Sequence, residues 1–234
     1  MAKRSILNLV VKVLSLPFIA ISRSAESMNL WNVREDVGRC LKVIDTYVGL
    51  IPNRFIGALV AAEDHRSPIH PGVDPIAMIR AGFVRFKCNQ IEGASTIEQQ
   101  LVRTVTGRYE RSVFRKIREQ AIAISVCRRR SKRQSKRQIA NAYLAVAYYG
   151  SGYVGLAGLK KCCGGELDCA DSRAILSAIA RLKYPKPLLP GQRWRQKIDR
   201  RVQYIAERMP EAANKPFQLI LASELRLLAR PAER

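Results

Sequence analysis

The sequence predicts an all-α protein, because apolar residues recur at the spacing of a helix through most of its 234 residues. Strand-like alternation is scarce, and Gly or Pro residues interrupt the pattern between segments. With 47% apolar residues, the chain has enough material for a hydrophobic core and for one domain with flanking segments. The expected helices lie at residues 50–63, 75–86, 94–106, 112–127, 136–148, 170–182 and 194–208.

Three parts are expected along the chain. Residues 1–25 are mostly apolar and are predicted to be a membrane anchor or a helix that lies in the membrane interface. Residues 45–210 carry the regular helical pattern and are predicted to form the globular domain. Residues 211–234 form a tail whose LILASELRLLA stretch is amphipathic, which favours packing on the domain over contact with a membrane.

The first apolar stretch reads SILNLVVKVLSLPFIAIS. As a helix, the part from Ile6 to Ile21 spans about 24 Å, somewhat less than the roughly 30 Å of a bilayer core. Its polar residues fall on one stripe of that helix, at Ser5, Asn8, Lys12 and Ser15.

This stretch lacks the small-x-small cleavage site of a signal peptide, so we expect it to be retained. Lys3 and Arg4 in front of it favour a cytoplasmic N-terminus. Three arrangements stay open: a short span, a helix in the interface, and a core helix of a soluble protein.

The chain is strongly basic, with 41 Lys and Arg against 19 Asp and Glu and a formal net charge of +22. Such a surplus indicates a polyanionic partner: nucleic acid, anionic lipid headgroups or a diphosphate substrate. The run RRRSKRQSKRQ at residues 128–138 is typical of a solvated face or of a lipid-headgroup contact. Neither zinc-finger spacing nor interleaved aromatic residues are present, so nucleic-acid binding is not expected.

The six cysteines include no C-x-x-C pair, which argues against a structural zinc site. The cluster CCGGELDC could hold a disulfide in an oxidising compartment. The simpler interpretation, which we favour, is three small apolar side chains near a helix end.

One stretch gathers acidic residues in this basic chain. It reads AAEDHRSPIHPGVDP and contains Glu63, Asp64 and Asp74, together with both histidines of the protein, His65 and His70. It is compatible with a metal site, a general acid/base site or a solvated loop. The spacing fits no standard set of metal ligands, so we expect His70 and Asp74 to brace the loop by hydrogen bonds.

Four motifs follow one another in the chain. They are E-D-x-x-x-x-x-H-x-G-V-D from Glu63, GASTIEQQ from Gly93, RKIRE from Arg115 and KRQIANAYL from Lys136. In this order and spacing they resemble the peptidoglycan glycosyltransferases of family 51, over about residues 50–208. The resemblance implies a lysozyme-like fold and the polymerisation of lipid II. It resolves the acidic stretch in favour of acid/base chemistry.

In that family an acceptor hydroxyl attacks C1 of a lipid-diphosphate-linked chain with inversion, which requires a carboxylate to take the proton. The resemblance makes Glu63 the general base, with Asp64 as its neighbour, and Glu119 the second functional glutamate. Its diphosphate-binding cations correspond to Arg103, Arg111, Arg115 and Lys116. Hydrogen-bonding groups of the cleft correspond to Ser95, Thr96, Gln99 and Gln100. A divalent metal, Mg²⁺ or Mn²⁺, beside Glu119 and the diphosphate is a further expectation.

The chain departs from the family pattern at five positions. Ser67 replaces an aromatic residue, Thr104 replaces an Asn, and Ala145 replaces the Asn of Tyr-Leu-Asn. Gln138 stands where the fourth motif often has an acid. Glu98 stands where the second motif has Thr or Ser, which puts a negative charge close to the expected diphosphate site.

The leading hypothesis is a monofunctional, membrane-anchored glycosyltransferase acting on lipid II or a related lipid-linked glycan. We expect it at the bacterial cytoplasmic membrane, with the domain on the outer face and its basic surface on anionic lipid. Only about 25 residues follow the globular part, so no transpeptidase domain is expected. Two rival hypotheses are a catalytically impaired protein that binds the precursor or scaffolds wall enzymes, and a lysozyme-type hydrolase.

Overall fold

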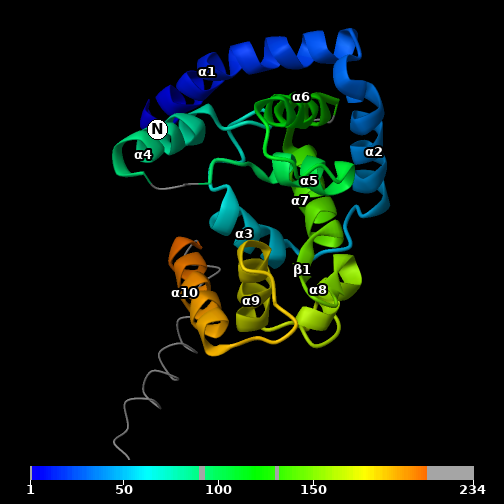
Figure 1. The fold of residues 1–234 in the computed structure, drawn as a ribbon, viewed down its shortest axis with the longest axis vertical. Helices are drawn as coiled ribbons and strands as arrows, with labels where there is room; N and C mark the ends of the chain where they lie inside the picture. Colours follow the sequence, from blue (N-terminus) through cyan, green and yellow to red (C-terminus); the bar gives the residue numbers. More distant parts are fainter. Residues whose placement is uncertain (1, 90–92, 130–131, 210–234) are drawn as a thin grey trace, which may run out of the picture. The chain divides into compact units, whose positions relative to one another are not determined.

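The structure, a computed structural model, describes residues 2–89, 93–129 and 132–209 (Figure 1). The expected C-terminal tail at residues 211–234 and the side chains of Lys3 and Arg4 lie outside the described residues. The helices are α1 Ala2–Ser27, the 3₁₀ helix η1 Leu30–Asn32, α2 Val33–Thr46, α3 Asn53–Glu63, α4 Pro75–Cys88, α5 Ile97–Thr106, α6 Val113–Arg129, α7 Lys132–Val146, α8 Gly155–Cys162, α9 Ser172–Lys183 and α10 Gln192–Arg208.

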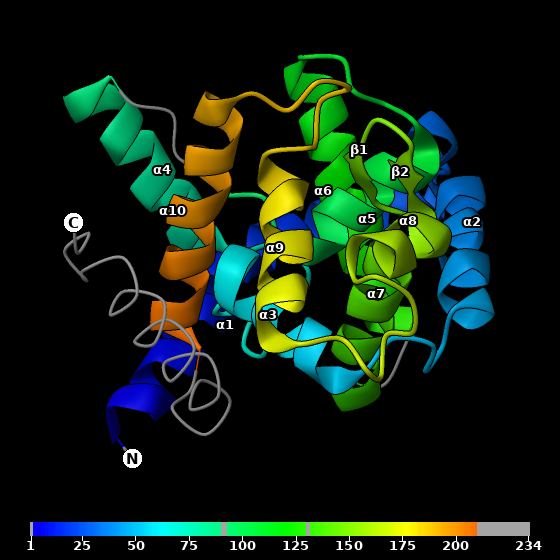
Figure 2. The same ribbon diagram turned by 90° about the horizontal axis from the view of Figure 1, so that it is seen from below.

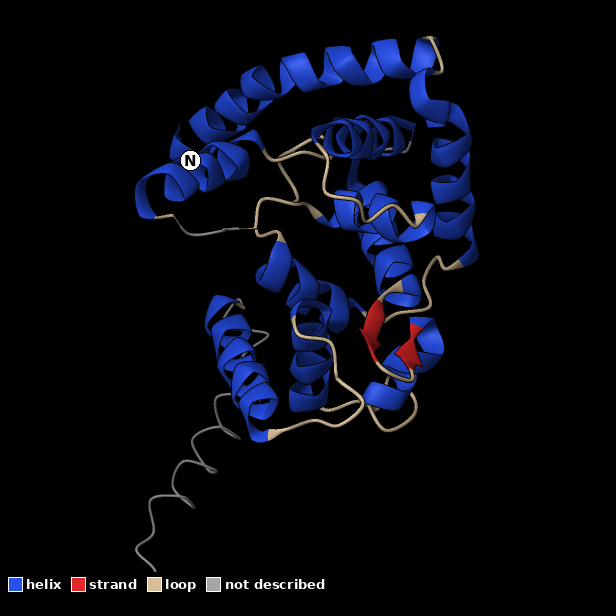
Figure 3. Ribbon diagram, in the orientation of Figure 1, coloured by secondary structure: helices blue, strands red, loops and turns tan. Residues whose placement is uncertain are grey.

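The all-α prediction is confirmed, and all seven expected helices are present with shifted ends. The described part of the chain has one small sheet, in which β1 Tyr148–Gly150 pairs antiparallel with β2 Tyr153–Val154 (Figure 3). Two helices, α2 and α8, were missing from the prediction.

The contacts divide the chain into two compact units. The first holds Met1–Ile51 and Glu63–Ala147, and the second holds Pro52–Ala62 and Tyr148–Arg234. Every candidate site residue belongs to the first unit, since Glu63 is the residue at which it resumes after α3.

Within the first unit, α5 packs against both α6 and α7 (Figures 1 and 2). It contributes Ile97 and Leu101 to the core, and each is 1% exposed. The helix begins at Thr96, whose side chain caps it by accepting the backbone N–H of Gln99. The amphipathic pattern of α5 therefore buries one face and leaves the Gln99, Gln100 and Arg103 side available for polar contacts.

Helix α2 lies against α5, α6 and α7 and brings a buried charge into the core. Asp36 is fully buried and forms ion pairs with Arg118 of α6 and with Arg39 of its own helix. A buried carboxylate is tolerated only with such partners, because an unpaired charge in the interior is costly. This pairing ties α2 to the helix that carries Glu119.

Helix α1 packs along α6, and its buried stripe is made of small or polar residues: Val11, Ser15, Ser22 and Ala25. Ser22 donates to the Ala121 carbonyl at 2.9 Å. Of the residues on the predicted polar stripe, Ser15 is buried, whereas Ser5 and Lys12 are exposed. Large apolar side chains point outward, with Ile6 and Leu9 62% and 63% exposed.

The Ser5–Ser27 part of α1 is 23 residues long and apolar enough to cross a membrane, and only 17% of its most apolar window is buried. A core helix of a soluble protein would be mostly buried, so the structure argues against that alternative.

The second unit packs α9 against α10 and joins the small sheet to α8. Asp171 caps α9 by accepting from the backbone N–H of Ala174 at 2.7 Å. Cys162 and Cys163 lie at the end of α8, and the structure records both as free thiols.

Candidate active site

The first carboxylate of the site is Glu63, the last residue of α3. Its side chain is half-buried, and its Oε2 accepts a hydrogen bond from Gln100 Nε2 at 3.3 Å. Tyr143 donates its hydroxyl to Gln100 Oε1 at 2.6 Å, which fixes the orientation of that amide. Burial and the charge of Glu63 raise the pKa of Tyr143, so the phenol stays protonated and remains a donor. Glu63 thus has a defined partner and stays partly accessible, as a proton acceptor must.

The second carboxylate, Glu119 of α6, gathers three cations. Its side chain is 3% exposed and accepts from Arg103 Nε at 3.1 Å, from Lys116 Nζ at 2.6 Å and from Arg115. Burial alone would raise the pKa of Glu119, but the bonds and charges of Arg103 and Lys116 outweigh it and hold the pKa below its ordinary value. Three positive charges around one carboxylate leave a net positive charge of two at this cluster.

Two polar side chains extend this cationic cluster. Ser95 Oγ accepts from Arg103 Nη2 at 3.3 Å and from Lys116 Nζ at 3.0 Å. Lys116 also donates to Gln99 Oε1, while the buried Nε2 of Gln99 has no hydrogen-bond partner in the described part of the chain. Burial lowers the pKa of Lys116 and outweighs the attraction of Glu119. The cluster is therefore desolvated and rich in donors, which suits a phosphate-bearing ligand.

One face of α5 links the two carboxylates. Gln99 and Arg103 are one turn apart, and Gln100 lies beside them. Gln100 holds Glu63, and Arg103 holds Glu119, so a single helix sets the position of both acidic groups.

Three expected site residues lie elsewhere. Thr96 is 2% exposed, and its hydroxyl is committed to the backbone of Gly72 and Gln99. Asp64, expected to bind substrate, is buried, and its carboxylate is committed to His70 and to the backbone N–H of Ile97. Arg111 is exposed in the segment before α6, and no hydrogen bond or ion pair of the described structure joins it to the Glu119 cluster. The structure thus brings together Glu63, Glu119 and most of the expected binding residues, but not these three.

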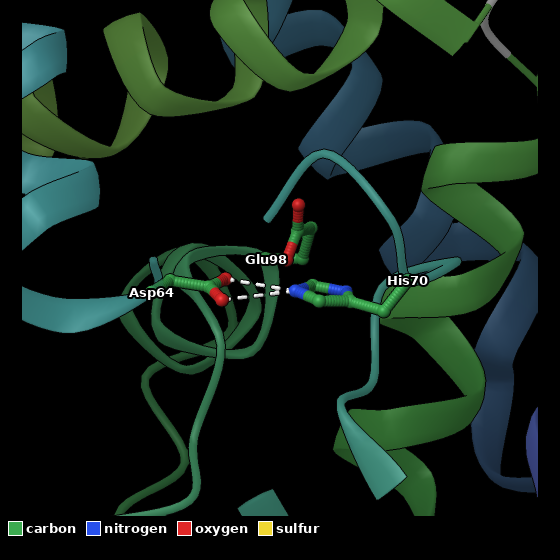
Figure 4. Close-up of side chains that lie close together, drawn as sticks. All are labelled: Asp64, His70 and Glu98. Atoms are coloured by element: carbon green, nitrogen blue, oxygen red, sulfur yellow. Dashed lines mark hydrogen bonds and ion pairs between the residues drawn. The ribbon is translucent and has the colours of Figure 1, made fainter. Parts of the chain in front are cut away.

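A second, buried network begins at Asp64, the residue after Glu63, and is called here the network behind Glu63 (Figure 4). His70 Nε2 lies 2.9 Å and 3.1 Å from the two oxygens of Asp64, and Asp64 Oδ2 also accepts from the backbone N–H of Ile97. His70 Nδ1 accepts from Lys136 Nζ at 3.3 Å and from the backbone N–H of Gly72 at 3.3 Å, so the partners assign the ring proton to Nε2. Lys136 Nζ also donates to Glu98 Oε1 at 2.6 Å.

The charges of this network support one another. Burial alone would lower the pKa of Lys136, but Glu98 outweighs burial and raises it. Burial alone would raise the pKa of Glu98, but Lys136 outweighs burial and lowers it. Both side chains therefore stay charged at neutral pH.

Asp64, His70 and Glu98 offer ligand atoms that all lie within 4.8 Å of one another, as a metal site would require. The Lys136 ammonium already supplies a cation to this group, however, because it donates to Glu98 and to His70. At Glu119 both oxygens accept from the three cationic side chains. The side chains at Glu119 therefore do not fit the expected divalent metal, and we derive no step through one.

The structure corrects one expectation about this region. Glu98 does not face the cationic cluster, since it is 1% exposed and paired with Lys136. The expectation that His70 and Asp74 brace the loop by hydrogen bonds is confirmed: His70 binds Asp64, and Asp74 caps α4 and binds Arg66.

Sequence reasoning missed two residues that hold the site together. Lys136 opens the fourth motif and Tyr143 lies near its end, but neither received a role. The sequence could have indicated them, because both lie within the fourth motif. They are seven residues apart, which puts them two helical turns apart on the same side of α7.

Comparison with known proteins gives a consistent result. A family model described as Transglycosylase matches residues 41–210. Penicillin-binding protein 1A of Aquifex aeolicus is 35% identical over 181 residues, which are 71% of this chain and 24% of that protein. The same-named protein of Rickettsia prowazekii is 32% identical over 169 residues, which are 69% of this chain and 20% of that protein. A candidate transglycosylase of Cupriavidus necator is 31% identical over 165 residues, which are 70% of this chain and 69% of that protein.

The chain spans about a quarter or less of the two penicillin-binding relatives. The matched family model nevertheless contains every helix from α3 to α10, and hence both Glu63 and Glu119. The expected lysozyme-like class is confirmed by this match. The chain therefore belongs to the transglycosylase family, the family 51 peptidoglycan glycosyltransferases.

Proposed function

We propose that the chain polymerises lipid II into glycan strands by inverting transfer, with release of a lipid diphosphate. The observation that carries the proposal is the cluster of Arg103, Arg115 and Lys116 on buried Glu119, joined through α5 to Glu63. A lysozyme-type hydrolase needs no such set of cations, because its leaving group is a sugar hydroxyl and not a phosphate.

The reaction assigned to this geometry has one proton acceptor. Glu63 takes the proton of the acceptor hydroxyl as that oxygen attacks C1 of the donor sugar. The new bond joins the acceptor oxygen to C1, and the bond between C1 and the phosphate oxygen breaks. The diphosphate leaves with its negative charge, which Arg103, Arg115 and Lys116 stabilise by charge-assisted hydrogen bonds.

Glu119 acts in this scheme as a positioning residue. It holds three flexible cationic side chains in one place before the ligand arrives, so less entropy is lost on binding. Because the cluster keeps a net positive charge, it still attracts a diphosphate.

The proposed location is the outer face of the bacterial cytoplasmic membrane, with α1 in the bilayer. The length and outward apolar side chains of α1 support this proposal, and so does the basic surface, which suits anionic lipid. The orientation of the domain remains part of the proposal.

The test is incubation of the full chain with lipid II, followed by product analysis. Glu63→Gln is expected to abolish polymer while lipid II still binds, because the amide cannot accept the proton. Glu166→Gln is the matched control, since Glu166 is an exposed carboxylate of the second unit. Polymer formed by Glu63→Gln at the rate of the control would remove Glu63 from its role.

The rival hypothesis of a catalytically impaired binding protein is not favoured. It rested on Ser67, Glu98 and Ala145, and all three are buried. None of them removes a contact of Glu63 or Glu119.

A further inference from the structure

A pocket of about 420 Å³ lies at the C-terminal end of α1, and arginines dominate its lining. None of the site residues described above lines it. The lining residues are Arg23, Glu26, Ser27, Arg34, Arg128 and Arg129. Arg128 and Arg129 open the run RRRSKRQSKRQ, and the proposed catalysis gives neither arginine a role.

Glu26 organises the two arginines of α6. Its Oε1 accepts from Arg129 Nε at 2.9 Å, and its Oε2 accepts from Ser125 Oγ at 2.8 Å and lies 3.7 Å from Arg128 Nη1. Four guanidinium groups against one carboxylate leave a net charge of three positive in the lining. Each guanidinium has five N–H donors, so these contacts leave donors for a further anion.

Arg34 is held at the same place by the end of α1. Its Nε donates to the Glu26 carbonyl at 2.6 Å, and it also donates to the Ser27 carbonyl. Terminal carbonyls of a helix lack partners within the helix and carry partial negative charge, so a cation is stabilised there.

The pocket lies where the apolar part of α1 ends. The outward side of that helix carries large apolar side chains, including Val13, Leu16 and Ile21 at 54%, 59% and 46% exposure. If α1 lies in a bilayer, its last turn reaches the headgroup region, where lipid phosphates are.

We propose that this pocket binds the phosphate of an anionic lipid headgroup, and this inference rests on the membrane placement proposed above. A lipid is favoured over a free phosphate because the cationic pocket adjoins an exposed apolar helix, which can hold the acyl chains. Guanidinium groups bind phosphate through paired, charge-assisted hydrogen bonds. The pocket therefore fixes how the first unit meets the membrane, independently of lipid II.

The test measures binding of phosphatidylglycerol to the full chain in detergent by native mass spectrometry, with phosphatidylcholine for comparison. The wild type is expected to retain phosphatidylglycerol selectively. Arg128→Gln with Arg129→Gln is expected to weaken this binding by about 30-fold, as the loss of two basic residues near an anionic surface predicts. Arg193→Gln with Arg195→Gln removes the same charge from exposed positions of α10 and is expected to leave binding unchanged.

Wild-type affinity in the Arg128/Arg129 variant would overturn the inference, and so would equal binding of both lipids. Displacement of the lipid by inorganic phosphate at similar concentration would show a site for free anions and overturn the lipid assignment. If that double variant melts at a lower temperature than the wild type, the single variant Arg23→Gln is used instead. It is expected to weaken phosphatidylglycerol binding by about 5-fold. Lipid II polymerisation is measured separately. If the chain binds phosphatidylglycerol through this pocket but makes no polymer, the result contradicts the proposed function and leaves the lipid site standing.

Discussion

Replacing Lys136 by Met tests whether the network behind Glu63 is organised by a buried ion pair. The substitution removes the only cation that the described residues place on Glu98 and leaves a buried carboxylate behind. Met has a similar length, so the packing of α7 against α5 is largely preserved.

The structure sets the size of the effect. Glu98 is 1% exposed, and its Oε2 has no hydrogen-bond partner in the described part of the chain, so Lys136 is the main compensation for this buried charge. Breaking a buried pair from one side costs about 3–5 kcal/mol. For a chain of this size that corresponds to a melting temperature lower by roughly 6–20 °C. Glu98→Gln is expected to cost less, because Lys136 keeps its contact with His70 and the attraction of Asp64.

The pH dependence of the pair follows from the directions of the two pKa values. The pKa of Glu98 is lowered in the folded state. Its contribution to folding stability is therefore present above the pKa of an ordinary glutamate and is lost as the pH falls through the pKa of the folded state. The pKa of Lys136 is raised in the folded state. Its contribution to folding stability is therefore present below the pKa of an ordinary lysine and is lost as the pH rises through the pKa of the folded state. The ion pair between Glu98 and Lys136 is therefore expected to persist between about pH 5 and 10.

The assay is thermal unfolding of the purified chain in detergent, followed by circular dichroism, for both single variants and the double variant. The two side chains are in contact, so their effects should not add. The double variant is expected to lose about 1–3 kcal/mol less unfolding free energy than the two single variants lose together. Additive losses, or a Lys136→Met variant as stable as the wild type, would refute the view that this pair is a coupled unit.

Three further outcomes are expected in the same preparation. Arg103→Gln should lower kcat/KM for lipid II by about 10²- to 10³-fold, as loss of a preorganised donor does, and an unchanged rate would remove it from phosphate binding. Tyr143→Phe should cost about 1 kcal/mol of unfolding free energy, because Gln100 loses the hydrogen bond that orients it toward Glu63. For the same reason it should lower kcat without changing KM, and an unchanged kcat would contradict this. Gly72→Ala should lower the melting temperature, since Gly72 has φ +113° and an added Cβ would lie 2.8 Å from the Ala123 carbonyl; wild-type melting would contradict it.

The helices of the fold could be predicted because their apolar residues repeat every three or four positions. In α2 this signal was present but was overlooked: Val33, Val37, Cys40 and Ile44 follow helical spacing and are all buried. Asp36 interrupts that pattern with a buried charge, and its partner Arg118 is 82 positions away in the sequence. A pairing of that kind depends on tertiary structure and has no local signal.

The face of α5 that carries Gln99, Gln100 and Arg103 could be predicted from motifs, because contiguous residues on one helix keep fixed relative positions. Glu98 was placed on the wrong side, although periodicity alone gives the answer. It shares its face with Leu101 and Val102, three and four positions later, and both are buried. What the sequence cannot supply is the partner that makes a buried acid tolerable there, namely Lys136 on another helix.

The start of α5 explains why the second motif is a continuous string of residues. Five successive residues bind five different partners: Thr96 binds the loop at Gly72, the backbone N–H of Ile97 binds Asp64, Glu98 binds α7, Gln99 binds α6 and Gln100 binds Glu63. Successive residues of a helix are rotated by about 100°, so these contacts together fix the rotation of α5 about its axis. A rotation by one residue would turn Glu98 toward the cationic cluster, where its charge would neutralise the cations meant for the diphosphate. The buried pair with Lys136 opposes that rotation, and in this way a residue on the core side of α5 holds Gln99, Gln100 and Arg103 in the orientation that the proposed reaction requires.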